Sequence, residues 1–142
     1  MFLLDVNVLI ALMDPQHQHH AISRHFFPQA QAEGWATCPL TENGLVRILS
    51  NPAYPNGDHD SETVREMLAT LCQLPGHQFW HKGLSLTDKK SFPHLPVSKK
   101  LTDMYLLALA ISYRGKLITF DKRINPNSFP GGKEAYLVLS EA

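Results

Sequence analysis

Four acidic side chains in this sequence stand at the borders of apolar segments. They are Asp5, Glu42, Asp103 and Asp121. Aspartate and glutamate are seldom buried without a pairing partner or a bound metal. A single acid in such a position commonly caps a helix, because the free N–H groups and the dipole at a helix N-terminus favour an anion. Four of them in one pattern indicate a shared site more strongly than any one does alone.

A group of four carboxylates would have a definite chemistry. Like charges a few ångströms apart repel strongly in a protein interior, so the four cannot all ionise at neutral pH without a compensating positive charge. A divalent cation supplies that charge, and ligation by oxygen alone suits Mg²⁺ or Mn²⁺. The expected reaction is hydrolysis of a phosphodiester, in which one or two ions activate water and stabilise the charge that develops on the phosphate.

These acids can meet only if the segments between them bring their positions together. Apolar runs and turn residues predict five short strands and several helices. The expected strands cover residues 2–4, 35–37, 78–80, 116–120 and 135–139, and the expected helices cover 5–13, 18–31, 41–50, 61–74 and 101–114. Asp5 and Thr41 are the expected N-caps of their helices, and Gly115 is expected directly after the last one. A further short helix is expected near residues 86–92.

The order of these elements predicts the fold class. Short apolar runs that alternate with helical patterns favour βαβ units and an α/β fold with a parallel sheet covered on both faces. Each of the four acids falls at a strand end or a helix start, positions that share the carboxyl edge of an open parallel sheet, where such folds bind ligands. With 142 residues and 44% hydrophobic content, the chain fits one compact domain over residues 1–142.

Charge and cysteine usage narrow the function classes. The formal net charge is zero, which argues against a uniformly basic nucleic-acid binder. Residues 1–80 carry 3 Lys or Arg and 8 Asp or Glu, whereas residues 81–142 carry 10 and 5, so a local basic face and ordinary solvated lysines both stay open. Cys38 and Cys72 imply no disulfide framework, and no apolar run could span a bilayer. We therefore expect a cytoplasmic protein that does not enter membranes.

Four segments of the chain carry a family resemblance. They are residues 3–10 (LLDVNVLI), 39–47 (PLTENGLVR), 101–108 (LTDMYLLA) and 117–121 (LITFD). In this order and with this spacing they resemble PIN-domain proteins, in particular the VapC-type toxins of bacterial toxin–antitoxin pairs. The resemblance covers nearly the whole chain, although any one segment alone is a weak signature.

The resemblance implies both a fold and an activity. The fold would be a three-layer α/β/α sandwich with a central, mainly parallel β-sheet. The activity would be that of a Mg²⁺- or Mn²⁺-dependent endoribonuclease that cuts RNA, commonly tRNA or rRNA. By motif position, Asp5, Glu42 and Asp103 would be the core metal ligands, and Asp121 would be the fourth acid, acting directly or through water.

Further expectations follow from the same resemblance. Asn7 and Thr119 match polar positions that orient ligands or water in such sites. The family also implies a small VapB-type antitoxin, which occupies a groove with a helix, and often a homodimer.

Basic residues and histidines form two further groups of candidate functional residues. Four basic residues flank the last two acids in sequence and are candidates for contacts with RNA phosphates, namely Lys99, Lys100, Lys122 and Arg123. Three histidines form a local cluster, namely His17, His19 and His20. Such a cluster could contact a transition metal or phosphate, but it is more often an exposed helix start, and it matches Mg²⁺ chemistry poorly.

Two other functional hypotheses remain open. Phosphotransferases of the haloacid dehalogenase type also begin with an aspartate after the first strand, but their signature needs a second aspartate where this chain has Asn7. A covalent aspartyl-phosphate on Asp5 would identify that class. Alternatively, the chain could bind RNA or a protein partner without catalysis, although the presence of all four acids argues against this. Growth arrest on expression, relieved by a co-transcribed partner, would separate a toxin from a passive binder.

Overall fold

The computed structural model describes residues 1–55, 59–125, 127 and 129–140. These residues form a five-stranded sheet with the strand order β3-β2-β1-β4-β5, and every neighbouring pair is parallel. The strands are β1 (Phe2–Leu4), β2 (Trp35–Thr37), β3 (His77–Phe79), β4 (Lys116–Thr119) and β5 (Tyr136–Val138). The predicted parallel sheet is therefore confirmed, and each strand lies within one or two residues of its expected position.

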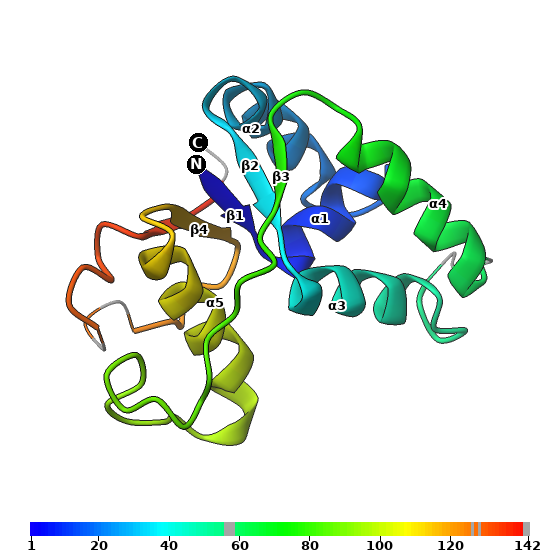
Figure 1. The fold of residues 1–142 in the computed structure, drawn as a ribbon. Coiled ribbons are helices and arrows are strands. Elements are labelled where there is room, and N and C mark those ends of the chain that lie inside the picture. Colours follow the sequence, from blue (N-terminus) through cyan, green and yellow to red (C-terminus); the bar gives the residue numbers. More distant parts are fainter. Residues whose placement is uncertain (56–58, 126, 128, 141–142) are drawn as a thin grey trace.

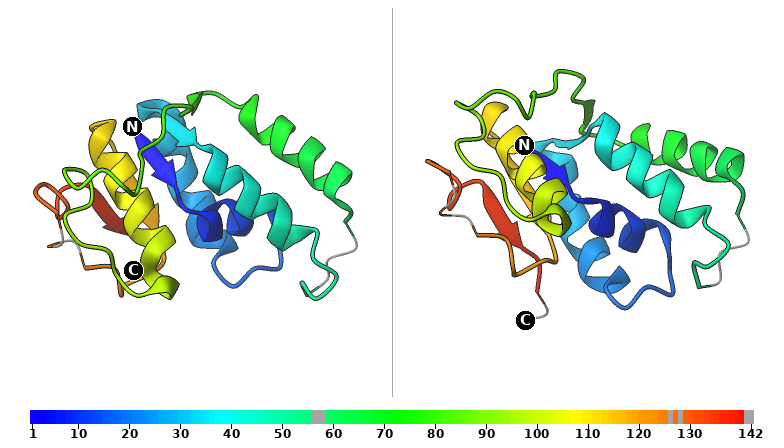
Figure 2. Two further views of the ribbon diagram at one scale, coloured as in Figure 1. Left: turned by 60° about the horizontal axis from the view of Figure 1, so that its bottom comes forward. Right: turned by 90° about the horizontal axis from the view of Figure 1, so that it is seen from below.

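Helices cover both faces of this sheet. They are α1 (Val6–Met13), α2 (His20–Glu33), α3 (Pro39–Leu49), α4 (Ser61–Cys72) and α5 (Leu101–Ser112), the last preceded by a 3-10 turn, η1 (Ser98–Lys100). One apolar core joins α1 to α4 with one face of the sheet, and a second joins α5 with the other face. The result is the expected three-layer α/β/α arrangement, in which α5 stands apart from α1, α3 and α4 (Figure 1, Figure 2).

Alternating side chains of the central strands supply both cores. Leu3 and Leu117 contribute to the core beneath α5, whereas Leu4 and Ile118 contribute to the core beneath α1. All four are completely buried. Successive side chains of a strand point to opposite faces, so a run that is apolar throughout suits a strand covered by helices on both sides.

The order of the strands creates a crevice between β1 and β4. The chain passes from β1 to β2 to β3 in one direction and then returns through α5 to β4, on the other side of β1. The connections on the two sides of β1 therefore run over opposite faces of the sheet. Ligands of open α/β sheets bind at such a switch point, outside the carboxyl ends of the strands. The residues that follow β1 and β4 thus occupy the expected position of a site.

The contact between α1 and α3 is unusually close at Gly44. A Cβ atom built on this residue would lie 2.9 Å from Cγ2 of Val6. Contacts this short do not occur between real side chains, so the two helices can approach to this distance only with glycine at position 44.

Two expected helix ends were wrong, and so was the short helix expected near residues 86–92. Helix α3 begins at Pro39 with Cys38 as N-cap, and Thr41 lies in its first turn, where the Thr41 hydroxyl accepts a hydrogen bond from the Cys38 N–H. Proline is well suited to the first helical position, because it has no N–H that would need a partner. At the end of α5 the left-handed residue is Arg114, with φ of 57°, rather than Gly115.

Residues 86–92 form turns instead of the expected short helix. The Asp88 carboxylate accepts hydrogen bonds from the Lys90 N–H and the Ser91 hydroxyl, which competes with helix formation. Among the described residues, every helix is too short or too polar to cross a lipid bilayer.

Candidate active site

Asp5 lies at the point where β1 passes into α1. It is the N-cap of α1, and its Oδ1 accepts a 2.7 Å hydrogen bond from the Val6 N–H. Its own N–H donates to the Ile118 carbonyl, which fixes it against β4. Only 5% of the residue is exposed. Because β1 passes directly into α1, the buried carboxylate of Asp5 lies at the crevice between β1 and β4.

Thr119 connects this carboxylate to the end of β4. Its hydroxyl donates a 2.7 Å hydrogen bond to Oδ2 of Asp5, and Oγ1 of Thr119 in turn accepts a 3.1 Å hydrogen bond from the Asp121 N–H. Thr119 is completely buried. Both oxygens of Asp5 thus have a protein donor, and the side chain is held in one orientation.

Asp103 and Asp121 face the same crevice from the other side. Asp103 lies in the first turn of α5, and Asp121 follows β4. Oδ1 of Asp121 accepts hydrogen bonds from the backbone N–H of Arg123 at 2.8 Å and from its Nε at 3.1 Å. The Tyr136 hydroxyl donates to the carbonyl of Asp121. These contacts fix the position of Asp121 relative to the sheet.

The pKa values of the three aspartates indicate that they share one electrostatic environment. Burial, the charges of Asp5 and Asp121, and a hydrogen bond to Asp121 raise the pKa of Asp103 to about 6. Burial also raises the pKa of Asp5 against the opposing effect of its hydrogen bonds from Thr119 and Val6. Burial acts in the same direction on Asp121, but hydrogen bonds from Arg123 outweigh it and lower the pKa of Asp121. The crevice therefore carries more negative charge than its surroundings neutralise.

The fourth predicted acid, Glu42, has different neighbours. Its Oε2 accepts a 2.7 Å hydrogen bond from the hydroxyl of Thr37, at the end of β2. Its charge acts on Cys72, at the end of α4, and on His77, at the start of β3. The structure therefore brings Asp5, Asp103 and Asp121 together and turns the carboxylate of Glu42 toward a separate polar cluster.

Sequence reasoning missed the residues around Glu42. Thr37 ends β2 as Thr119 ends β4, and this common position at the end of a strand was a signal that could have identified it. Cys72 and His77 carried no comparable signal, because only the turn between α4 and β3 brings them beside α3.

A cavity of 430 Å³ opens beside two of the three aspartates. Asp103 and Asp121 line it together with three of the four predicted basic residues, namely Lys99, Lys100 and Arg123. The fourth, Lys122, is exposed. A cavity that joins carboxylates to lysine and arginine side chains offers both metal ligands and contacts for the phosphates of a nucleic acid.

Two other predicted features lie close to this region. Asn7 is exposed in the first turn of α1. The rings of His17 and His19 stack on Phe120, with His19 at a centroid distance of 4.4 Å, and His20 Nδ1 is 2.7 Å from the Ala11 carbonyl. Among the described residues, one group of His, Cys, Asp or Glu side chains has its ligand atoms within 4.8 Å of one another, and it consists of Glu42, Cys72 and His77. Neither the three histidines nor the three aspartates form such a group.

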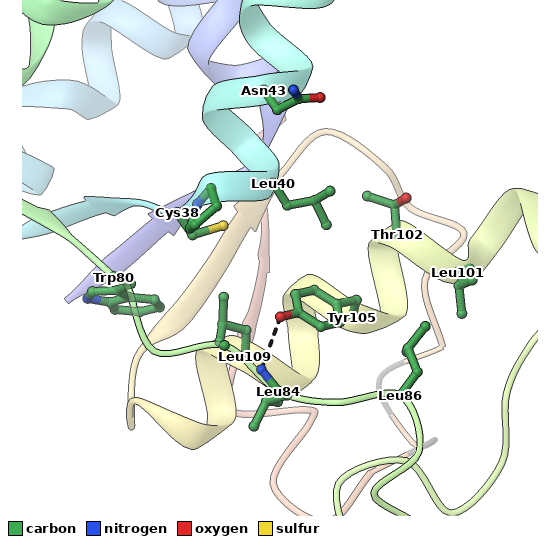
Figure 3. A pocket seen from close by; sticks show the side chains of 12 residues that line it. Cys38, Leu40, Asn43, Trp80, Leu84, Leu86, Leu101, Thr102, Tyr105 and Leu109 are labelled. Carbon is green, nitrogen blue, oxygen red and sulfur yellow. Dashed lines mark hydrogen bonds between the residues drawn. The ribbon is translucent and has the colours of Figure 1, made fainter.

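A second cavity, of 650 Å³, lies between the start of α3 and α5 (Figure 3). Leu40, Leu84, Leu86 and Leu109 contribute to its wall, and no charged side chain lines it. The hydroxyl of Tyr105 accepts a 3.1 Å hydrogen bond from the Leu84 N–H within it. Its apolar lining suits a protein or small apolar partner better than RNA.

Comparison with known proteins identifies the family. The PIN domain family model matches residues 2–129. The chain belongs to the PIN domain family. This assignment removes the main support for the phosphotransferase alternative, which rested on the single aspartate after the first strand.

Relatives of this PIN domain match it over most of its length. Ribonuclease VapC44 of Mycobacterium tuberculosis is 39% identical over 139 residues, which cover 95% of this chain and 96% of the relative. Ribonuclease VapC39 of the same organism is 40% identical over 131 residues, or 91% and 94% of the two chains. Ribonuclease VapC38 is also 40% identical, over 121 residues and 85% of each chain.

Proposed function

We propose that this PIN domain is an endoribonuclease of the VapC type, the toxin of a toxin–antitoxin pair. The observation that carries the proposal is the electrostatic coupling of Asp5, Asp103 and Asp121, of which Asp103 and Asp121 line one cavity together with lysine and arginine. Relatives named as ribonucleases, aligned over most of both chains, support the same activity.

Mg²⁺ or Mn²⁺ is the cofactor that this donor set would hold, with Asp5, Glu42, Asp103 and Asp121 as its four acids. Glu42 would have to turn its carboxylate away from the Thr37 hydroxyl to join the three aspartates. The aspartates offer only oxygen, and the pKa of Asp103 is raised by burial and by the neighbouring charges of Asp5 and Asp121, an excess of negative charge that a divalent cation would relieve. A bound ion would lower the pKa of water and stabilise negative charge on the scissile phosphate.

The residues of the chain then have distinct roles. Asp5 is held rigid by Val6 and Thr119, so that its carboxylate needs little reorganisation when it binds a cation. Lys99 and Lys100 line the same cavity and would bind the phosphates that flank the scissile bond. Asn7 and Thr119 are proposed to orient ligands or water.

A cleavage assay with a matched pair of variants tests the proposal. The purified chain should cut RNA with Mg²⁺ or Mn²⁺ and stop when a chelator is added. Asp5→Asn should abolish cleavage while the fold is kept, because asparagine can still accept a hydrogen bond at the N-cap. Asp60 is likewise an N-cap, that of α4, but it is exposed and lies outside the site, so Asp60→Asn is the control. Full metal-dependent cleavage by the Asp5→Asn variant would disprove the assignment.

The partners of the protein follow from the same proposal. We propose tRNA or rRNA as the substrate, a small VapB-type antitoxin as the protein partner, a homodimer as the assembly and the cytoplasm as the location. The uncharged cavity between α3 and α5 offers an apolar surface that an antitoxin could cover. Growth arrest on expression, relieved by a co-transcribed small protein, would separate this function from passive binding of RNA or a partner.

A further inference from the structure

A second group of potential ligands surrounds the hydroxyl of Thr37. Glu42 from α3, Cys72 from the end of α4 and His77 from β3 each offer one ligand atom, and these atoms all lie within 4.8 Å of one another. All three residues are partly buried. We call Glu42, Cys72 and His77 the Thr37 cluster, because the Thr37 hydroxyl donates to Glu42 and lies 2.8 Å from Nε2 of His77.

The donor types of the Thr37 cluster differ from those of the aspartates. A thiolate, an imidazole and a carboxylate suit Zn²⁺ and similar transition metals, whereas Mg²⁺ prefers oxygen alone. Three protein ligands leave one tetrahedral position for water, as in zinc sites that remain open. The three ligand atoms are up to 4.8 Å apart, somewhat farther than the ligand atoms around a single bound ion. Small rotations of the side chains would bring them to the shorter distances.

The backbone that carries two of these ligands is firmly held. Cys72 and His77 flank the turn from α4 to β3, in which Gly76 has φ of 88° and approaches the Gln31 carbonyl so closely that a Cβ would lie 2.4 Å from its oxygen. The ring of His77 packs on Trp35 at a centroid distance of 4.6 Å, and the indole Nε1 of Trp35 donates to the Pro75 carbonyl. Ligands whose positions are fixed in advance lose little freedom when a metal binds.

A hydrogen-bond network without a metal is the simpler interpretation of the same contacts. The Thr37 hydroxyl has a single hydrogen, which it donates to Glu42, so His77 would have to donate from Nε2 to the Thr37 oxygen. The Cys72 thiol belongs to the same network, because it also forms a hydrogen bond with Thr37. The three side chains nevertheless bring a carboxylate, a thiol and an imidazole within 4.8 Å of one another, a combination that transition metals bind well.

We propose that Glu42, Cys72 and His77 bind one transition-metal ion of the Zn²⁺ type, with the fourth position open to water. If the chain is the ribonuclease proposed above, this second site has a regulatory consequence. Glu42 cannot serve the aspartate site while it ligates Zn²⁺. Zn²⁺ bound at the Thr37 cluster would therefore inhibit RNA cleavage by holding Glu42 away from the three aspartates. Mg²⁺ alone would leave the Thr37 cluster unoccupied.

Titration with Co²⁺ under reducing conditions tests the metal site without any activity assay. The metal-free protein should bind one Co²⁺ that gives a thiolate-to-cobalt charge-transfer band and visible bands typical of four ligands. Any Co²⁺ at the aspartates would have oxygen ligands only and would give no charge-transfer band. Cys72→Ser should lose the charge-transfer band, and His77→Gln should weaken binding. The matched control is Cys38→Ala, because Cys38 is the other free thiol and lies outside the cluster. Asp5→Asn should bind Co²⁺ at the Thr37 cluster as the wild type does.

Several outcomes would overturn the proposal. These are the absence of a charge-transfer band, a band that survives Cys72→Ser, or a band that disappears with Cys38→Ala. The regulatory consequence is tested separately, since Zn²⁺ should inhibit cleavage by the wild type more strongly than cleavage by Cys72→Ser. Equal inhibition of both would overturn that consequence. If no RNA is cut at all, the Co²⁺ spectrum still decides the metal site, so failure of the proposed function can be distinguished from failure of this inference.

Discussion

The hydroxyl of Thr119 donates a 2.7 Å hydrogen bond to Oδ2 of Asp5, and this bond joins the ends of β4 and β1. The two residues are 114 positions apart in sequence. Since Thr119 also accepts from the Asp121 N–H, one buried hydroxyl links two acids of the candidate site. The orientation of Asp5 therefore depends on a side chain that is not itself acidic.

Thr119→Val should impair both stability and cleavage. Valine has the same shape but leaves Oδ2 of Asp5 and the Asp121 N–H without their partner, which should cost about 1 to 3 kcal/mol in the free energy of unfolding. Loss of a residue that orients a metal ligand should reduce cleavage about 10- to 100-fold. Urea denaturation and a cleavage assay over a range of Mg²⁺ concentrations measure the two effects. Thr119→Ser keeps the hydroxyl and should stay close to the wild type, and equal loss in both variants would contradict this role for the hydrogen bond.

Asp103→Asn should stabilise the metal-free protein at neutral pH. Burial and the charges of Asp5 and Asp121 raise the pKa of Asp103 to about 6. A raised pKa means that the folded state favours the protonated acid, so the unfavourable contribution is absent below about pH 4 and grows as the pH rises toward 6. The gain in the free energy of unfolding should be about 1 kcal/mol at pH 7, because water screens this partly exposed group, and it should shrink as the pH falls to 4.5.

Thermal unfolding with a chelator and with Mg²⁺ checks this expectation. Mg²⁺ should raise the melting temperature of the wild type and have little effect on Asp103→Asn. Asp88→Asn, a change at an acid in an exposed turn, should give no such gain at pH 7. A melting temperature of Asp103→Asn below that of the metal-free wild type at pH 7 would show that the aspartates do not repel one another in the folded state.

Arg123→Gln should affect metal binding and RNA binding in opposite directions. Arg123 donates to Oδ1 of Asp121 and lowers the pKa of that carboxyl against burial. Removing its charge leaves the crevice more negative, so the Mg²⁺ concentration that gives half-maximal cleavage should fall. The KM for RNA should rise, and the slope of log affinity against log salt should become shallower by about 0.7 to 1 if one phosphate contact is lost.

Arg65→Gln is the matched control for this change. Arg65 is an exposed arginine that is also paired with an acid, Glu62, but it lies on α4. It should alter neither the Mg²⁺ requirement nor the salt dependence. Parallel changes in the two variants would mean that net charge, rather than the position of Arg123, is responsible.

Gly44→Ala should push α3 away from α1. The added methyl group would lie 2.9 Å from Cγ2 of Val6, and overpacking of this kind costs about 1 to 3 kcal/mol in the free energy of unfolding. Val6→Ala removes the colliding methyl groups, so the double variant should recover part of the loss. Denaturant unfolding of the two single variants and the double variant forms a complete cycle. Strict additivity would show that the two residues do not press against each other.

Most of the sheet was predictable from the sequence because β1, β2 and β4 are short, mainly apolar and buried runs. Asp5 could be placed for the same reason, since it follows β1 and caps α1 at one point. The start of α3 could not be placed from side-chain capping alone, because Pro39 at the first helical position outweighed Thr41 as a cap. Arg114 rather than Gly115 took the left-handed conformation at the end of α5. Gly115 instead packs where a Cβ would meet the Met1 carbonyl and the Trp80 ring.

The direction of a side chain was harder to predict than the position of its backbone. The sequence places Glu42 at a helix start, as it does Asp103. Its carboxylate nevertheless turns toward Thr37, because a buried hydroxyl and two partly buried polar residues offer it partners there. The two partly buried residues, Cys72 and His77, come from α4 and β3, and no spacing in the sequence indicates that they approach α3.

The strand order also determines when the site can exist during synthesis of the protein. β1 lies beside β4, so the crevice has only one wall until the second half of the chain is made. A ribosome that has released the first hundred residues has delivered Asp5 and Glu42, but neither Asp103 nor Asp121. A ribonuclease built in this order cannot complete its active site while most of it is still being translated.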